Sequence, residues 1–296
     1  MARPVPLTVA FAVACVGIAV FSLMDALMKG LTIEIGVYNA LFWRTLASVA
    51  IGLPLVLYQR IRPTRAAMRL HVIRGSATSV MALLFFWGLA RVPMAQAIAL
   101  CFIAPLIALY LASALLGERI KRGVIIASLI GFAGVLVIVW GQSSVPHSRD
   151  QLLGTVAILI SAGIYAYNII LMRQQAKEAG PLEIAFFTSL VMVSWYLLAA
   201  PFLAVWPDAA HWPSLGGAAM LAYVSLLCLG WAYARAEAQY LAPVEYTGFI
   251  WAALFGFLFF SEPVAVQTLV GAAMIIAACF MATRSAVRPD PEKGMI

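Results

Sequence analysis

Residues 104–118 read APLIALYLASALLGE, and residues 248–262, which lie 144 positions later, read GFIWAALFGFLFFSE. Both stretches are almost wholly apolar and end in a glutamate. Each carries a small residue at every fourth position: Ala104, Ala108 and Ala112 in the first, and Gly248, Ala252 and Gly256 in the second. Small residues let helix backbones approach closely in lipid. The two stretches are therefore predicted to be helices whose small-residue faces meet other helices.

The same offset of 144 residues relates many other positions of the chain. It pairs Met28-Lys29 with Met172-Arg173, Phe42 with Phe186, Trp87 with Trp231, Ala90-Arg91 with Ala234-Arg235, and Glu118 with Glu262. A constant offset between distinctive residues indicates an internal repeat. We expect one half at residues 1–143, a second half at residues 144–284 and a tail at residues 285–296.

The composition indicates a membrane protein. Hydrophobic residues make up 64% of the 296 residues and charged residues 10%, and the mean hydropathy is +0.99. Soluble domains are only about 45–50% apolar and about 25% charged. Apolar runs long enough to cross a bilayer, at about 20 residues each, lie near residues 7–31, 36–58, 72–91, 93–116, 123–141, 152–173, 183–206, 214–235, 243–260 and 264–283.

These ten runs predict an all-α integral membrane protein with ten transmembrane helices. Runs 72–91 and 93–116 are separated only by Arg91–Pro93, so they are either two spans or one bent element. Five helices per half is an odd number, and the second half must therefore cross the membrane upside down. Two inverted five-helix repeats are typical of secondary transporters, which bind their substrate near the midplane between the halves.

The lysines and arginines predict the orientation. With a cytoplasmic N-terminus, fifteen of the 19 lie on the inside, Lys29, Arg91 and Arg149 lie outside, and Arg44 stays within a helix. Such a bias follows the positive-inside rule. We expect a multi-pass protein of the cell inner (plasma) membrane with both termini in the cytoplasm.

Several function classes have no support in the sequence. The four cysteines lie in apolar runs without metal-ligand spacing, and the three histidines are scattered. A glycine-rich phosphate loop is absent, which argues against ATP-driven transport. The net charge of +7 lies in short loops, so it does not indicate a nucleic-acid partner. We expect no metal, no cofactor and no enzymatic activity.

Charged residues within apolar runs are candidates for function, because charge in hydrocarbon is costly. Asp25 and Arg44 lie at similar depth in the first two helices, and the repeat replaces both, by Ile169 and Thr188. A structural ion pair is the favoured interpretation; the alternatives are that Arg44 binds a substrate carboxylate or that its side chain reaches the interface. Glu245, one turn into its helix, caps that helix or couples transport to protons. Glu118 and Glu262 are expected to be solvated helix ends.

Aromatic and small polar residues at mid-depth are the candidate substrate ligands. For two tryptophans near helix ends, Trp87 and Trp231, anchoring at the membrane interface is an alternative to substrate binding. The candidate substrate-binding residues are Ser22, Met24, Ser79, Trp87, Tyr165, Asn168, Tyr223, Trp231 and Trp251.

Short motifs in both halves resemble the EamA-type repeats of the drug/metabolite transporter superfamily. In the first half they are Val92-Pro93-Met94-Ala95-Gln96, Ala104-Pro105 and Leu115-Leu116-Gly117-Glu118; in the second they are Ala242-Pro243-Val244-Glu245-Tyr246, Trp251–Gly256 and Phe260-Ser261-Glu262. The resemblance implies a ten-helix carrier, commonly an exporter of amino acids, including the aromatic ones, with a central site between the halves. Pro105 departs from the repeat, because its counterpart is Phe249.

The expected function is export of amino acids or related small amphipathic metabolites by alternating access. An apolar, aromatic-lined cavity with few charges suits such substrates. A multidrug exporter of lipophilic cations is one alternative, and a non-transporting membrane scaffold or receptor is another. The expected partners are a small-molecule substrate and the lipid bilayer. The oligomeric state is left open, with a monomer favoured.

Overall fold

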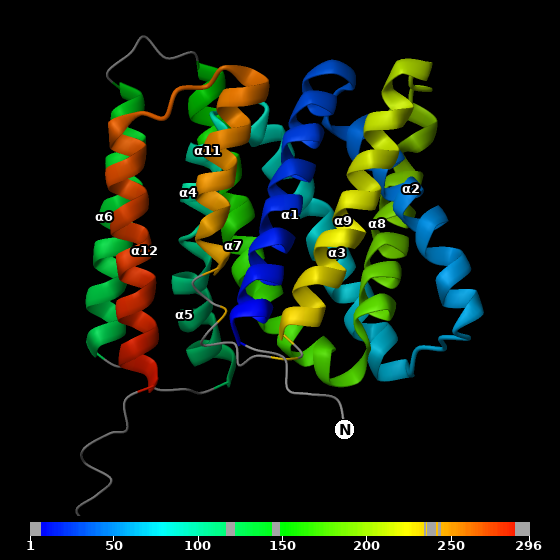
Figure 1. Cartoon of the computed structure of the whole chain (residues 1–296), viewed down its shortest axis with the longest axis horizontal. Helices are drawn as coiled ribbons and strands as arrows, with labels where there is room; N and C mark the ends of the chain where they lie inside the picture. The colour runs from blue at the N-terminus through cyan, green and yellow to red at the C-terminus, as the bar shows by residue number, and fades with distance from the viewer. Residues whose placement is uncertain are drawn as a thin grey trace, which may run out of the picture.

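The computed structural model describes residues 7–116, 122–143, 149–233, 235, 241 and 244–287, apart from a few side chains in these ranges. The described chain is a bundle of roughly parallel and antiparallel helices (Figure 1). Its helices are α1 (Leu7–Ile35), α2 (Val37–Tyr58), α3 (Arg65–Leu89), α4 (Met94–Cys101), α5 (Ala104–Leu116), α6 (Arg122–Ser143), α7 (Arg149–Glu178), α8 (Pro181–Leu203), the 3₁₀ turn η1 (Ala209–His211), α9 (Trp212–Tyr233), α11 (Thr247–Phe260) and α12 (Val266–Val287).

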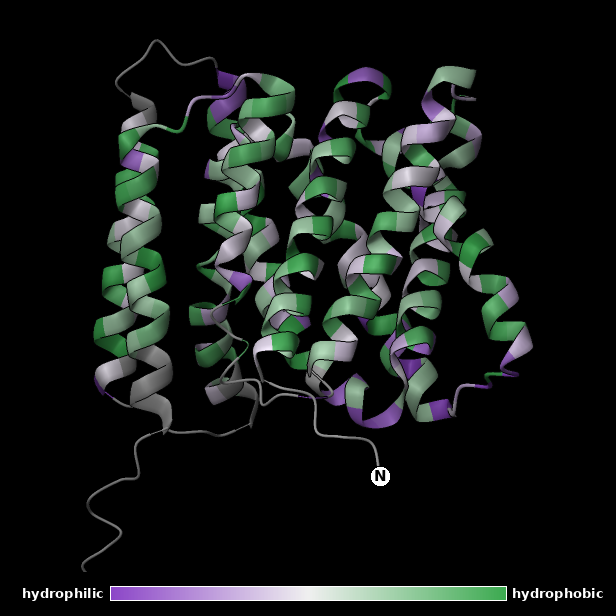
Figure 2. Cartoon of the chain, viewed as in Figure 1, coloured by the Kyte–Doolittle hydropathy of each residue, from purple (hydrophilic) through white to green (hydrophobic). Residues whose placement is uncertain are grey.

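The ten-helix prediction is confirmed. Seven described helical spans are long and apolar enough to cross a membrane, and three shorter apolar helices complete the set. α3 and the α4–α5 segment are two separate spans, joined by a turn over residues 90–93. Figure 2 shows hydrophobic residues along the helices and hydrophilic residues mainly at the two ends of the bundle.

The helix bounds display the repeat directly. Shifted by 144 residues, α6 (122–143) coincides with α12 (266–287), and α2 (37–58) differs from α8 (181–203) by one residue at its end. α1 packs against α9 and α3 against α7, which are equivalent contacts when the halves are exchanged. Phe102 and its repeat counterpart Tyr246 contact each other edge to face, with ring centroids 5.3 Å apart. The fold is thus a pair of inverted five-helix repeats.

The predicted continuous helix over residues 93–116 is wrong in one respect, because it breaks into α4 and α5 at Phe102 and Ile103. Pro105 explains the break: it has no N–H to donate, and its ring clashes with the carbonyl of the preceding turn. The predicted helix over residues 243–260 also has a turn, at Tyr246, which is the counterpart of Phe102. Phe249 stands at the position of Pro105 in this second half, so the two halves bend at the same position and the bend does not depend on Pro105 alone.

The small-residue faces lie inside the bundle, as predicted. Ala104 and Ala252 are fully buried, and Gly248 and Gly256 are also buried. A Cβ atom added at Gly256 would lie 3.3 Å from the Cβ of Met94, so α11 approaches the start of α4 at this point. The side chain of Ala112 lies outside the described part of the structure.

The ends of the helices define two ends of the bundle. α1, α3 and α8 all begin at the lower end in Figure 1, where α12 finishes, and α11 begins about midway along the bundle. We call this the α1-start end. α1 and α11 both finish at the opposite end, which we call the α1-finish end; the positive-inside rule predicts that it faces the outside.

Candidate functional site

The two charged residues at mid-depth are buried between the helices but do not form the predicted ion pair. Asp25 on α1 is 2% exposed, and Arg44 on α2 is partly buried. Among the described residues no ion pair within 4.0 Å joins them, although they are close enough to interact electrostatically. Asp25 Oδ2 and Arg44 Nε have no hydrogen-bond partner in the described part of the chain.

Two tyrosines from the second half complete this region. Tyr196 on α8 donates its hydroxyl hydrogen to the Ser79 carbonyl oxygen (2.9 Å), and Tyr223 on α9 donates to the Ser48 carbonyl oxygen (3.1 Å). Both tyrosines interact electrostatically with Arg44. We call Asp25, Arg44, Ser79, Tyr196 and Tyr223 the central cluster.

The central cluster draws on both halves. Asp25, Arg44 and Ser79 come from α1, α2 and α3 of the first half, whereas the tyrosines come from α8 and α9 of the second. Burial of the tyrosine rings is nearly complete, at 3% and 7% exposure. The arrangement therefore holds one carboxyl group, one guanidinium and two hydroxyl groups in an aromatic setting between the halves.

Other predicted site residues lie near the same depth without joining the cluster. Ser22 and Met24 are buried on α1. Asn168 on α7 donates to Thr78 Oγ1 (3.1 Å), and its Oδ1 has no partner among the described residues. Tyr165, also on α7, interacts electrostatically with Glu245 and Arg74.

Three predicted tryptophans lie apart from the central cluster. The Arg91 guanidinium lies over the Trp87 ring, 3.6 Å from its centroid, and Arg235 lies over Trp231 at 4.3 Å. These two cation–π pairs are repeat counterparts, and they support the anchoring alternative for both tryptophans. Trp251 stacks on Phe255 within α11.

The acidic candidates differ from each other in their surroundings. Glu245 is exposed near the start of α11 and interacts electrostatically with Tyr165 and Tyr246. The expectation that Glu262 is a solvated helix end is wrong, because its side chain is 19% exposed and forms an ion pair with Lys29. Glu118, its repeat counterpart, lies outside the described residues.

Lys29 was expected outside the membrane but is buried in the bundle, with 3% of its side chain exposed. α1 continues to Ile35 and so places Lys29 one and a half turns before its end. Lys29 Nζ donates to the Val92 carbonyl oxygen (2.7 Å) and to Glu262 Oε1, and it lies 5.1 Å from the centre of the Phe260 ring. Glu262 Oε2 accepts a hydrogen bond from the Met94 N–H (2.8 Å). We call this set the Lys29–Glu262 contact.

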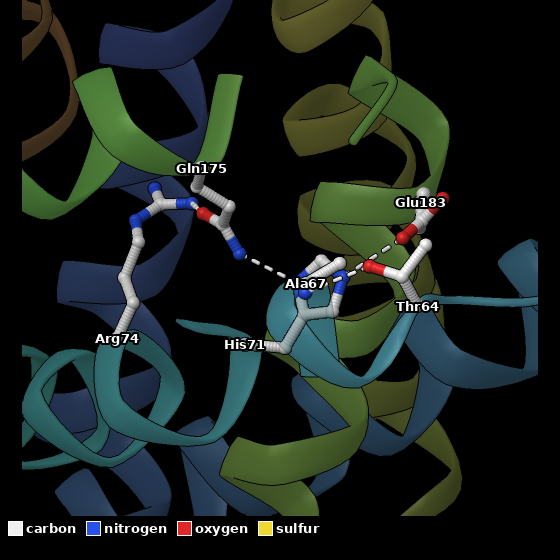
Figure 3. A network of polar contacts seen from close by, with 6 residues as sticks. All are labelled: Thr64, Ala67, His71, Arg74, Gln175 and Glu183. Carbon is white, nitrogen blue, oxygen red and sulfur yellow. Dashed lines mark hydrogen bonds and ion pairs between the residues drawn. The ribbon is translucent and has the colours of Figure 1, made fainter. Parts of the chain in front are cut away.

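A chain of hydrogen bonds near the α1-start end joins α3 to α7 and α8 (Figure 3). Arg74 Nη1 donates to Gln175 Oε1 (2.7 Å), Gln175 Nε2 lies 2.5 Å from His71 Nδ1, and His71 Nε2 lies 3.1 Å from Glu183 Oε1. The amide nitrogen only donates, so His71 accepts at Nδ1 and donates from Nε2 to the carboxylate. His71 and Gln175 are fully buried, and this chain ties the two halves together.

Two cavities in the described part of the structure lie away from the central cluster. One of about 390 Å³ is lined by apolar residues of α5, α6 and α7, including Leu106, Tyr110 and Phe132. Another lies between α3 and α8 beside Trp195. The central cluster lines neither cavity, and Asp25 Oδ2 and Arg44 Nε are buried in protein. The described residues contain no metal-binding group of three or more His, Cys, Asp or Glu.

Sequence reasoning missed Tyr38, Tyr196 and the chain around His71. Tyr196 lies in an apolar run without a charged neighbour, and nothing in the sequence shows which way its ring points. Tyr38 donates its hydroxyl hydrogen to the Tyr196 carbonyl oxygen (2.5 Å). The sequence did carry a signal for Lys29, because a charged residue before the end of an apolar run indicates a buried charge.

Ten helices in two inverted repeats around a buried polar cluster define a membrane transporter. Residues 8–140 and 152–284 match the EamA-like transporter family, so the chain belongs to that family. The two matched ranges are again 144 residues apart. Members of the family are transporters and not enzymes.

Relatives of known transport function cover most of this chain. The pseudopaline exporter CntI of Pseudomonas aeruginosa is 25% identical and covers 90% of this chain and 92% of its own. A riboflavin transporter of Rhizobium johnstonii is 28% identical, with 93% and 90% covered. An S-adenosylmethionine uptake transporter of Rickettsia prowazekii is 25% identical, with 87% and 86% covered.

A solved crystal structure has the same fold. Its TM-score is 0.63 at 18% sequence identity, and the match covers 94% of this chain and 97% of that chain. The relatives carry different small molecules in different directions. Family membership therefore establishes that the chain is a membrane transporter.

Proposed function

We propose that this protein exports small zwitterionic metabolites, with amino acids of apolar side chain as the leading class. The observation that carries the proposal is that Asp25, which is buried, and Arg44, which is partly buried, form no ion pair with each other. Each keeps a polar atom without a hydrogen-bond partner among the described residues. A buried charge without a partner is costly, and an amino acid supplies both missing partners, its ammonium for Asp25 and its carboxylate for Arg44.

The geometry of the cluster suits such a ligand. A guanidinium binds a carboxylate through two parallel hydrogen bonds. The tyrosine rings of Tyr196 and Tyr223 offer apolar faces for a side chain, and their hydroxyl groups already donate to backbone carbonyls. A hydroxyl oxygen keeps acceptor capacity after donating, so each hydroxyl can also accept from an ammonium group.

Lipophilic cations remain a second candidate class, favoured by the buried carboxylate of Asp25. A permanent cation would gain from Asp25 but would be repelled by Arg44, which interacts with the same carboxylate. A zwitterion has no such conflict. The relatives named as carriers of riboflavin and S-adenosylmethionine show no common substrate, so the substrate proposal rests on the cluster.

A transport panel in proteoliposomes tests the substrate class. Leucine and phenylalanine represent zwitterions, their amides lack the carboxylate, their N-acetyl derivatives lack the ammonium, and tetraphenylphosphonium represents lipophilic cations. We expect counterflow of the zwitterions at a rate at least about tenfold above that of either derivative, which corresponds to about 1.4 kcal/mol. Faster counterflow of tetraphenylphosphonium than of the amino acids would support the second class instead.

The proposed direction is outward, with both termini in the cytoplasm. The charge bias supports this orientation, and CntI is an exporter by name. Single cysteines at Arg65 and Ser148, in a cysteine-free background, test the orientation with an impermeant thiol reagent added to intact cells. Labelling is expected at position 148. Labelling at position 65 with protection at position 148 would reverse the orientation, and loss of cellular export on deletion of the gene tests the direction.

A further inference from the structure

The Lys29–Glu262 contact connects parts of the chain that belong to different halves. Lys29 lies on α1, and Val92 and Met94 lie where α3 passes into α4, all in the first half. Glu262 follows α11 in the second half. Its carboxylate binds Lys29 with one oxygen and the Met94 N–H with the other. The contact therefore holds the end of α11 against the start of α4.

A buried polar line on α1 connects this contact with the central cluster. Ser22, Asp25, Lys29 and Thr32 are spaced by three or four residues and are all buried, at 2–6% exposure. Residues at such spacing lie on one face of a helix. Asp25 belongs to the central cluster, so the contact lies one helical turn beyond it toward the α1-finish end. This face of α1 provides a polar route from the cluster to that end.

The energetics of the Lys29–Glu262 contact suit an ion pair that can form and separate. Burying the charges of Lys29 and Glu262 is costly, and their mutual attraction offsets much of this cost. When the halves separate, water replaces the lost partner. The paired and the hydrated states then differ little in free energy, whereas a joint of purely apolar side chains would lose its burial on opening.

We propose that Lys29 and Glu262 form the gate at the α1-finish end of the transport pathway. The pair closes the route from the central cluster while α11 contacts α4, and it separates when the pathway opens at that end. The gate serves whichever solute the protein carries, so it stands independently of the zwitterion proposal. The assignment of this gate to the outside uses the orientation that the positive-inside rule predicts for the α1-finish end.

Accessibility of Cys101 provides a test without any solute. Cys101 ends α4 and lies near Asp25, so its accessibility reports on the central cluster. With Cys15, Cys228 and Cys279 replaced by alanine, an impermeant methanethiosulfonate reagent is added outside intact cells. We expect Glu262→Gln to raise the labelling rate of Cys101 about tenfold, because it leaves the buried Lys29 without a counter-charge. Lys29→Met should raise it less.

Exposed residues of the same types supply the controls. Lys177→Met and Glu178→Gln change the same side chains at exposed positions near the end of α7 and should leave the labelling rate unchanged. Equal labelling rates in Lys29→Met, Glu262→Gln and the parent would overturn the gate. If Lys29→Met and Glu262→Gln raise the labelling rate of Cys101 only when the reagent is delivered from the cytoplasmic side, the assignment of the gate to the α1-finish end is contradicted.

A cross-link tests the gate even if the charge variants fold poorly. The Cβ atom of a residue at position 256 would lie 3.3 Å from that of Met94, close to the separation of about 3.5–4.5 Å found in disulfides. Oxidation of Met94→Cys/Gly256→Cys should lower labelling of Cys101 from outside at least about fivefold, as measured by mass spectrometry of the peptide, and reduction should reverse it. The two single variants under the same oxidant are the controls. Unchanged labelling of the cross-linked protein would refute the gate.

Discussion

Gly36 is the single residue between α1 and α2, and its backbone has φ 79° and ψ 153°. Residues other than glycine are strained in this region, at a cost of about 1–3 kcal/mol. No atom lies within 4 Å of a Cβ added at Gly36 or at Gly30, which is within α1. Gly36→Ala should therefore lower the melting temperature in detergent, whereas Gly30→Ala should raise or preserve it, since alanine favours helices. If Gly36→Ala and Gly30→Ala melt at the same temperature, the backbone between α1 and α2 relaxes to accept alanine and the prediction is wrong.

Gln175 is the residue on which the buried hydrogen-bond chain depends, because it binds Arg74 and His71 at once. Gln175→Ala leaves both partners unsatisfied, and a lost partner of a buried polar group costs about 1–3 kcal/mol. We predict a lower melting temperature for Gln175→Ala and little change for Gln174→Ala, whose side chain is exposed. A melting temperature equal to wild type in both variants would mean that water replaces the amide.

Single residues also show where sequence reasoning stops. The depth of Asp25 and Arg44 followed from helix geometry, but their pairing did not, because rotamers and neighbouring helices decide which atoms meet. Lys29 was assigned to the outside because the apolar run ends at residue 31, whereas the helix continues to Ile35. Its partners Val92 and Glu262 are 63 and 233 residues away. Only the assembled bundle brings them together.

At the scale of helices, close backbone contact between α3 and α7 depends on glycine. A Cβ atom at Gly88 would lie 2.6 Å from the Gly154 carbonyl oxygen, so the two helices would have to separate. Gly88→Ala should destabilise the protein by about 1–3 kcal/mol through overpacking. Gly163→Ala on α7 meets no atom within 4 Å and serves as the control. Thermal melting of both variants in detergent measures the difference, and the prediction fails if Gly88→Ala is as stable as Gly163→Ala.

Helix ends were predictable to within seven residues, with the start of α3 the furthest off, but helix irregularities were not. Apolar length and turn residues indicated ten spans, and the small-residue faces indicated which sides of α5 and α11 pack inside. The interruption at Phe102 and Ile103 required weighing Pro105 against a long apolar run. The turn at Tyr246 has no sequence signal of its own, and only its contact with Phe102 across the repeat shows that the two turns correspond.

At the scale of the whole molecule, the repeat carried most of the predictable information. One offset of 144 residues and an odd number of helices per half lead to the inverted architecture without any contact being known. The identity of the transported solute could not be predicted in this way, because it depends on a few side chains that the halves bring together. Tyr196 and Tyr223 come near Arg44 only after α8 packs against α2 and α3 and α9 packs against α2.

The central claim is that Arg44 binds the carboxylate of the transported solute. The most direct test measures the apparent affinity for leucine and for leucinamide in wild type, in Arg44→Gln and in Arg149→Gln, whose arginine is exposed. We predict that wild type and Arg149→Gln prefer leucine by about tenfold or more, equivalent to about 1.4 kcal/mol per tenfold. Arg44→Gln should bind both compounds with equal affinity. A preference for leucine that is unchanged in folded Arg44→Gln protein would contradict the account.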